Sequence, residues 1–195
     1  MKNEIIISGH GGQGVLELAN YVSYYEMLKG RHVAYTPSYG PESRGGKVKC
    51  YVVASDEEID SPIVEEPDCL IVMNIPSMDF VPLLRKNGTL LMNSSLISIN
   101  PQRTDIRVLK VPATEIADQL KLERWGDFQD TRIAANSVMF GAYLSVAKEE
   151  LDEKSLDNVF NHFLTDRKSV YIPLNAIAVR RGFEFSESTQ LAPRA

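Results

Sequence analysis

The stretch Ile5-Ile6-Ile7-Ser8-Gly9-His10-Gly11-Gly12-Gln13-Gly14-Val15 places a run of β-branched residues directly before glycines at G-x-G-x-x-G spacing. The residues that follow, 15–28, repeat their apolar side chains with the period of a helix. The stretch therefore predicts a strand, a glycine turn and a helix start. Such a turn suits an anion, because glycine lets a ligand approach the backbone and the helix start offers unpaired N–H groups. Tight packing needs the same glycines, so the turn alone leaves both interpretations open.

Composition limits the classes of protein that the chain can belong to. A length of 195 residues with 44% hydrophobic and 24% charged residues is typical of one globular domain. The net charge of −5 argues against nucleic acid or an anionic membrane as the main partner. The sequence has no apolar run of the ~20 residues that a membrane span needs and no visible secretory signal, which favours the cytoplasm. Cys50 and Cys69, far apart in the sequence, are predicted to be buried free thiols.

The first part of the chain predicts a βαβ unit followed by an antiparallel strand. The helix over 15–28 ends near Gly30, and a second strand over 32–36 closes at Pro37, so the two strands of the unit are parallel. The broad apolar surface of the helix predicts burial on more than one side. Residues 47–53 alternate apolar and polar side chains, which predicts an antiparallel strand with one wet face near a sheet edge.

The remaining sequence predicts alternating strands and helices, and therefore an α/β fold: a single three-layer Rossmann-like domain whose mostly parallel sheet has an antiparallel edge strand. The small residues of the helix over 135–146 predict close packing on the sheet, and Trp125 is expected in a surface loop. The domain is expected over 1–185, and 186–195 as a flexible C-terminal tail. The further strands are expected over 68–74, 89–93 and 106–111, and the further helices behind Pro76, over 113–122, over 135–146, around 156–163 and over 173–181.

The missing motifs narrow the chemistry. A nicotinamide site normally places an acidic residue at the end of the second strand, and His32 to Ser38 contains none, which makes NAD a poor fit. The sequence also lacks a P-loop, C-x-x-C pairs and a nucleophile elbow. His10 lies inside the glycine turn, where it can act as a hydrogen-bond donor. His32 and His162 are expected at a strand start and on a helix surface.

A second loop, Ser38-Tyr39-Gly40-Pro41-Glu42-Ser43-Arg44-Gly45-Gly46, leaves the second strand at the carboxyl edge of the sheet, where the glycine turn also emerges. Arg44, flanked by small residues and near Tyr39, suits recognition of phosphate or carboxylate. An ion pair with Glu42 or with a partner subunit explains the same arginine equally well.

The two loops, together with Ala135-Asn136-Ser137-Val138-Met139-Phe140-Gly141-Ala142, resemble the gamma subunit of 2-oxoacid:ferredoxin oxidoreductases. The resemblance covers residues 4–183, and the Tyr39-Gly40-Pro41-Glu42 form of the second loop is similar to the 2-oxoglutarate or branched-chain type. It implies a pyruvate/ketoisovalerate oxidoreductase gamma-type domain. It also implies a cytoplasmic complex that converts a 2-oxoacid, by our reading 2-oxoglutarate, to an acyl-coenzyme A and reduces ferredoxin.

In this family the alpha, beta and delta chains are the partners, and thiamine diphosphate and iron–sulfur clusters are held outside the gamma chain. The present sequence agrees, since it contains neither a thiamine motif nor cluster cysteines. The resemblance implies no catalytic residue and no metal on this chain. Its implied roles are structural completion of the complex and part of a coenzyme A site. The residues expected at that site are Gly9, His10, Gly11, Gly12, Gln13, Gly14, Tyr39, Arg44, Gly45 and Gly46.

Two other functions stay open from the sequence. One is a stand-alone Rossmann-like protein that binds a nucleotide or phosphate at the same turn. The other is a scaffold in which the glycines serve only subunit packing, so that Arg44→Ala would leave the affinity for coenzyme A unchanged. The tyrosines of the first helix, at positions 21, 24 and 25, suit either a subunit interface or the core.

Overall fold

The computed structural model of the protein describes residues 2–39, 46–123 and 134–191. Within these ranges the chain forms one six-stranded sheet with the order β2-β3-β1-β4-β5-β6. The order places β1, which leads into the glycine turn, inside the sheet. The strands are β1 (Lys2–His10), β2 (His32–Tyr39), β3 (Lys47–Ser55), β4 (Cys69–Val72), β5 (Thr89–Asn93) and β6 (Arg107–Val111).

The predicted mixture of parallel and antiparallel strands is confirmed. β1, β4, β5 and β6 pair in parallel, whereas β3 is antiparallel to both of its neighbours, β1 and β2. β1 and β2 run in the same direction, as a βαβ unit requires, but β3 lies between them. β2 continues through Pro37, where the sequence predicted that it would stop. As the edge strand it has one row of backbone groups that needs no partner, so it tolerates proline.

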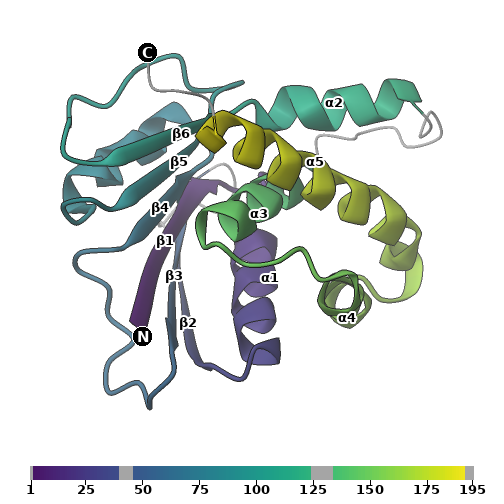
Figure 1. Ribbon diagram of the computed structural model, residues 1–195, viewed down its shortest axis with the longest axis horizontal. Coiled ribbons are helices and arrows are strands. Elements are labelled where there is room, and N and C mark those ends of the chain that lie inside the picture. The colour runs from purple at the N-terminus through teal and green to yellow at the C-terminus, as the bar shows by residue number, and fades with distance from the viewer. Residues whose placement is uncertain (1, 40–45, 124–133, 192–195) are drawn as a thin grey trace.

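The α-helices within the described ranges lie against one face of the sheet (Figure 1). Their apolar side chains form the larger core cluster with β-strand residues such as Ile5, Ile7 and Val52. As predicted, α1 is buried on two sides, because it packs between the strands β2 and β3 and the helices α3 and α4. The helices are α1 (Val15–Leu28), α2 (Ala113–Glu123), α3 (Ala135–Val146), α4 (Glu153–Phe163) and α5 (Ile172–Leu191).

The opposite face of the sheet has a thinner covering. A second core cluster there combines Ile6 and Leu70 with Val81 of the 3₁₀ helix η1 (Ile75–Leu83) and with loop residues such as Val64. Tyr51 of β3, on the face that the sequence predicted to be wet, packs against this cluster. The three layers are therefore unequal, with the α-helical layer forming the larger part of the core.

Helices α3 and α5 cross at a pair of glycines. A Cβ added to Gly141 would lie 1.9 Å from the carbonyl oxygen of Val179, and one added to Gly182 would lie 1.9 Å from that of Val138. The sequence predicted that the small residues of α3 pack on the sheet. Gly141 instead allows the backbone of α5 to approach α3, because neither glycine has a side chain to separate the helices.

The C-terminal part of the fold also differs from the prediction. Residues 186–191, expected in a loose tail, complete helix α5, and Ser186 is fully buried and donates to the carbonyl of Gly182 at 2.8 Å. The helix extends because its second half packs on α3, where Gln190 Nε2 donates to the Ser145 hydroxyl at 2.7 Å. Residues 192–195 and the expected loop around Trp125 lie outside the described residues.

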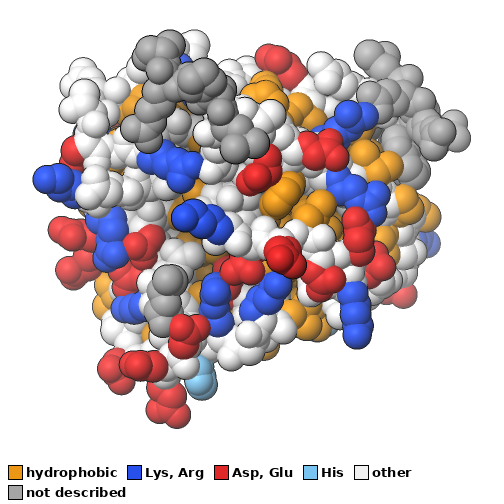
Figure 2. All heavy atoms as spheres, viewed as in Figure 1, with side chains coloured by type: hydrophobic (Ala, Val, Ile, Leu, Met, Phe, Trp, Pro, Cys, Tyr) orange, Lys and Arg blue, Asp and Glu red, His pale blue; other side chains and the backbone are white. Residues whose placement is uncertain are grey.

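The described surface carries mixed charge. Figure 2 shows basic and acidic side chains interleaved over the face formed by α2 and α5. No helix among the described residues is both long enough and apolar enough to cross a membrane. Together with the net charge of −5, the mixed surface gives no basic footprint for nucleic acid on the face shown.

Candidate functional site

The glycine turn joins the carboxyl end of β1 to the first turn of α1. Gly12 and Gly14 have φ angles of 94° and 69°, a region that residues with a side chain rarely adopt. Gly14 is the N-cap of α1 and makes no side-chain cap, while its carbonyl accepts from Leu18 N at 2.8 Å. The first N–H groups of a helix have no partner within the helix. The turn therefore presents backbone donors at the position where the sequence predicted an anion site.

The glycines of this turn have different surroundings. A Cβ on Gly9 would lie 2.7 Å from Cγ2 of Val15, and one on Gly14 would lie 2.5 Å from Nδ2 of Asn136. A Cβ on Gly12 would meet no atom within 4 Å. Packing within the chain thus explains Gly9 and Gly14, whereas Gly12 borders open space.

Gln13 holds the turn against the neighbouring strand. Its Oε1 accepts from His10 N at 2.8 Å and from Asn74 Nδ2 at 2.7 Å. Asn74 follows β4 and caps η1 by accepting from Ser77 N at 3.1 Å. These bonds cross the switch point between β1 and β4, where ligands bind in open α/β sheets. In this structure the amide oxygen of Gln13, predicted to contact a cofactor, is already used by the protein.

The second loop returns to the glycine turn. Gly11 N donates to the carbonyl oxygen of Gly46 at 3.2 Å, and Gly46 directly precedes β3. Tyr39 ends β2 at the same edge of the sheet. The prediction that the two loops share one edge is thus confirmed for these backbone positions. Arg44 and Gly45 lie outside the described residues.

His10 faces a hollow of about 300 Å³ on the β3 side of the turn, which is also lined by Gly11, Gly12, Leu16 and Val48. Within the described part of the chain, the Nδ1 atom of His10 is buried and has no hydrogen-bond partner. Buried polar atoms usually have one. The residue thus lines the hollow, while its Nδ1 atom is enclosed and unpaired among the described residues.

A second hollow, of about 290 Å³, lies on the other side of the turn. It extends from Gly12 and Gly14 to α1, the 3₁₀ helix η3 (Asp166–Tyr171) and α5. Sequence reasoning missed most of its lining, because the residues come from segments far apart in the chain. Only Tyr21, two turns into α1, carried a signal, and it was interpreted as interface or core. The lining residues besides the turn are Glu17, Tyr21, Leu164, Lys168, Tyr171 and Asn175.

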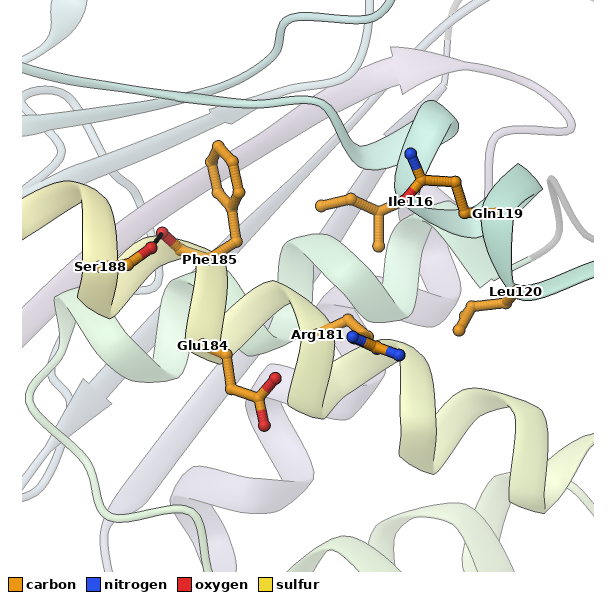
Figure 3. Close-up of a pocket in the computed structure, with 7 residues that line it drawn as sticks. All are labelled: Ile116, Gln119, Leu120, Arg181, Glu184, Phe185 and Ser188. Atoms are coloured by element: carbon orange, nitrogen blue, oxygen red, sulfur yellow. Dashed lines mark hydrogen bonds between the residues drawn. The ribbon is translucent and has the colours of Figure 1, made fainter. Parts of the chain in front are cut away.

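A third hollow, of about 420 Å³, lies between α2 and α5, away from the turn. Figure 3 shows Ile116 and Leu120 from α2 and Arg181 and Phe185 from α5 along it. The Ser188 hydroxyl donates to the carbonyl of Phe185 at 2.8 Å within α5. None of its lining residues belongs to the predicted site.

The cysteines and aromatic residues support the core. Cys50 and Cys69 are free and buried, as predicted, and burial raises the pKa of the Cys50 thiol to about 11 and that of Cys69 to about 12. Tyr21 and Tyr25 are buried in the core, and Tyr24 stacks on the ring of His162 at 4.3 Å. The tyrosines of α1 are thus used for packing within this chain.

Comparison with known proteins identifies the family. A model of the pyruvate ferredoxin/flavodoxin oxidoreductase family matches residues 4–185. The chain belongs to this family. The resemblance indicated by the two loops is thereby confirmed, and the family match runs from within β1 to within α5, including the glycine turn and the Gly46 contact.

Relatives occur both as short chains and as parts of longer ones. The 2-oxoglutarate synthase subunit KorC of Methanocaldococcus jannaschii is 33% identical over 96% of this chain and 95% of its own length. The ketoisovalerate oxidoreductase subunit VorA of Methanothermobacter thermautotrophicus is 34% identical over 92% of this chain, which spans only 35% of that relative. The domain therefore stands alone in one relative and forms about a third of the other.

Solved structures share the fold. The gamma subunit of a keto/oxoacid ferredoxin oxidoreductase from Geobacter sulfurreducens superposes with a TM-score of 0.73 at 24% identity, over 95% of this chain and 99% of that one. The pyruvate oxidoreductase subunit PORC of Thermotoga maritima superposes with a TM-score of 0.67 at 25% identity, over 94% of this chain and 96% of that one. These likenesses confirm the predicted α/β architecture.

Proposed function

We propose that this chain is the gamma-type subunit of a 2-oxoacid:ferredoxin oxidoreductase and that it does not carry the catalytic centre. The match to the family over residues 4–185 carries the proposal. The size of the chain supports it, because KorC, named as a subunit, is covered over 95% of its length. The partners would be alpha, beta and delta chains that hold thiamine diphosphate and iron–sulfur clusters, with ferredoxin as electron acceptor. We expect the complex in the cytoplasm, where Cys50 and Cys69 stay reduced.

The proposed substrate is 2-oxoglutarate. The full-length similarity to KorC and the Tyr39-Gly40-Pro41-Glu42 form of the second loop support it. VorA has nearly the same identity, so 3-methyl-2-oxobutanoate is the competing substrate. Dye reduction by the complex, purified through a tag on this chain, tests the choice. A higher kcat/KM for 2-oxoglutarate is expected, and a higher value for the branched-chain acid would overturn it.

The glycine turn and second loop are proposed to form part of the coenzyme A site. The open space over Gly12, the hollow lined by His10 and the bond between Gly11 and Gly46 fit a phosphate-bearing ligand at this edge. When bound, coenzyme A supplies the thiol that accepts the acyl group. The chain's own residues would bind and orient its phosphates: the turn through backbone N–H groups, and Arg44 through its guanidinium. Gly45 and Tyr39 would form the remaining part of this chain's contribution to the coenzyme A site.

Substitution of Arg44 tests this site against a scaffold role. Arg44→Ala in the purified complex is expected to raise the KM for coenzyme A about tenfold, since charge-assisted bonds contribute about 1.5 kcal/mol or more. Arg107→Ala, on the strand at the opposite edge of the sheet, is the matched control. An unchanged KM in Arg44→Ala would support the scaffold, in which packing alone explains glycines such as Gly9 and Gly14.

A further inference from the structure

The hollow between the glycine turn and η3 is partly open to solvent and combines an apolar wall with polar groups. It measures about 290 Å³ and begins at Gly12, where no side chain fills the space. Its apolar wall comes from Leu164 and from the rings of Tyr21 and Tyr171. A ligand bound over the turn would have this pocket directly beside it.

Tyr21 places a polar group at the pocket. The side chain is 1% exposed, and its ring packs edge-on against Phe160 with centroids 5.3 Å apart. Among the described residues its hydroxyl has no hydrogen-bond partner. The other two deeply buried tyrosines do have one, because Tyr25 donates to the carbonyl of Glu150 at 2.9 Å and Tyr143 donates to Oε1 of Glu26 at 2.7 Å. A tyrosine hydroxyl without a protein partner beside a cavity can donate to a ligand inside that cavity.

The charge of the wall decides which part of a ligand can enter. Glu17 lines the pocket one turn before Tyr21, and its Oε1 lies 3.4 Å from Nζ of Lys168 at the rim. The Glu17–Lys168 pair leaves this wall without a net positive charge that would attract a phosphate group. Oε2 of Glu17 accepts from Nδ2 of Asn136 at 3.4 Å, and the carboxylate keeps lone pairs for a further donor. Such a donor can be a neutral amine. The pocket therefore suits a planar, uncharged group with both a donor and an acceptor on its edge, while phosphates stay over the turn.

We propose that this pocket binds the base of a nucleotide whose phosphates lie over Gly12. It rests on the proposed function, in which that nucleotide is the adenosine half of coenzyme A. The Tyr21 hydroxyl donates to a ring nitrogen, and the Glu17 carboxylate accepts from the exocyclic amine. The base packs against Leu164 and Tyr171, and the pantetheine arm extends out of this chain.

The test uses the purified complex and the two halves of coenzyme A as competitive inhibitors. Tyr21→Phe removes only the hydroxyl. It is expected to weaken inhibition by adenosine bisphosphate about fivefold, as for one lost hydrogen bond, and to raise the KM for coenzyme A equally. Inhibition by phosphopantetheine stays unchanged. Tyr24→Phe is the matched control, because Tyr24 lies on the same helix but stacks on His162 outside the pocket.

A second variant tests recognition of the exocyclic amine. Wild-type complex should bind adenosine bisphosphate more tightly than inosine bisphosphate, which carries a carbonyl in place of the amine. Glu17→Gln should remove this preference, because an amide can donate as well as accept. An unchanged melting temperature would show that both variants are folded.

Each outcome has one meaning for the pocket. If Tyr21→Phe leaves inhibition by adenosine bisphosphate unchanged, the pocket holds only water and the inference is overturned. If only phosphopantetheine inhibition weakens, the arm occupies the pocket and the inference is equally overturned. Failure of the proposed function looks different, because wild-type complex would then show no dependence on coenzyme A and no inhibition by either half.

Discussion

At the crossing of α3 and α5, a Cβ on Gly141 would lie 1.9 Å from the carbonyl oxygen of Val179; at the tip of the glycine turn, a Cβ on Gly12 would meet no atom within 4 Å. The crossing uses glycine to bring two backbones together. The turn uses it to reach a backbone conformation with φ of 94° beside two hollows. Packing therefore explains glycine at the crossing, whereas backbone conformation explains it at Gly12, and the open space there leaves room for the ligand that we propose.

The largest effect is expected at the crossing. Gly141→Ala should lower the free energy of unfolding by about 3 kcal/mol, because the new methyl group overlaps backbone that cannot move without separating two helices. Urea denaturation of the purified chain measures it. A loss below ~1 kcal/mol would show that the crossing adapts easily, and the contrast with the turn would disappear.

Gly14 is expected to show an intermediate effect. Gly14→Ala should lower the free energy of unfolding by about 2 kcal/mol, because φ of 69° disfavours alanine and the Cβ meets the amide of Asn136 at 2.5 Å. The same denaturation series measures it. A cost equal to that of Gly12→Ala would mean that the Asn136 side chain moves aside freely.

Gly12 is expected to contribute least to stability among these glycines. Gly12→Ala should lower the free energy of unfolding by about 1 kcal/mol, from backbone conformation alone. The matched control is Gly30→Ala, since Gly30 also has a positive φ, 82°, and open space around it, but ends α1 at the far end of the helix. The two variants should be equally stable, and a markedly less stable Gly12→Ala would indicate hidden packing at the turn.

The smallest effect is expected at the thiols in the core that supports both regions. Burial raises the pKa of Cys50 to about 11 and of Cys69 to about 12, so both stay protonated and unreactive at neutral pH. A thiol reagent at pH 7 should modify neither cysteine in the native chain and both in urea. Because the native thiols keep their protons to a higher pH than the unfolded thiols, their contribution to the free energy of unfolding is complete below the pKa of the unfolded thiols. The free energy of unfolding then falls as the pH rises toward 11. Rapid modification of either cysteine in the native chain would contradict their burial in the core.

Much of the fold follows from local sequence patterns. The helix over 15–28 and the strand over 89–93 were predicted with the bounds that the structure has, because apolar periodicity and the turns at Gly30 and Gly88 define them locally. The insertion of β3 between β1 and β2 depends on strand pairing over long distances. The extension of α5 past Ser186 likewise depends on burial against α3. Local sequence patterns therefore predict neither the position of β3 in the sheet nor the full length of α5.

The candidate site also has parts that the sequence predicts and parts that only the folded chain shows. The turn and its position beside Gly46 were predictable, since the second loop leaves β2 at the same carboxyl edge of the sheet from which the turn leaves β1. The use of the Gln13 amide to hold Asn74 was not, because Asn74 is brought there only by the pairing of β1 with β4. The pocket around Tyr21 was also hidden, since Leu164, Lys168 and Tyr171 approach the turn only in the folded chain.

The measurement that tests the account most directly is the KM for coenzyme A of the complex carrying Gly12→Ala, with Gly30→Ala as control. If Gly12 provides access to a ligand, its KM should rise about tenfold, by ~1.4 kcal/mol of lost binding, while kcat stays within about twofold. The control should retain the wild-type KM. A wild-type KM in Gly12→Ala would contradict the assignment of the turn as a ligand site.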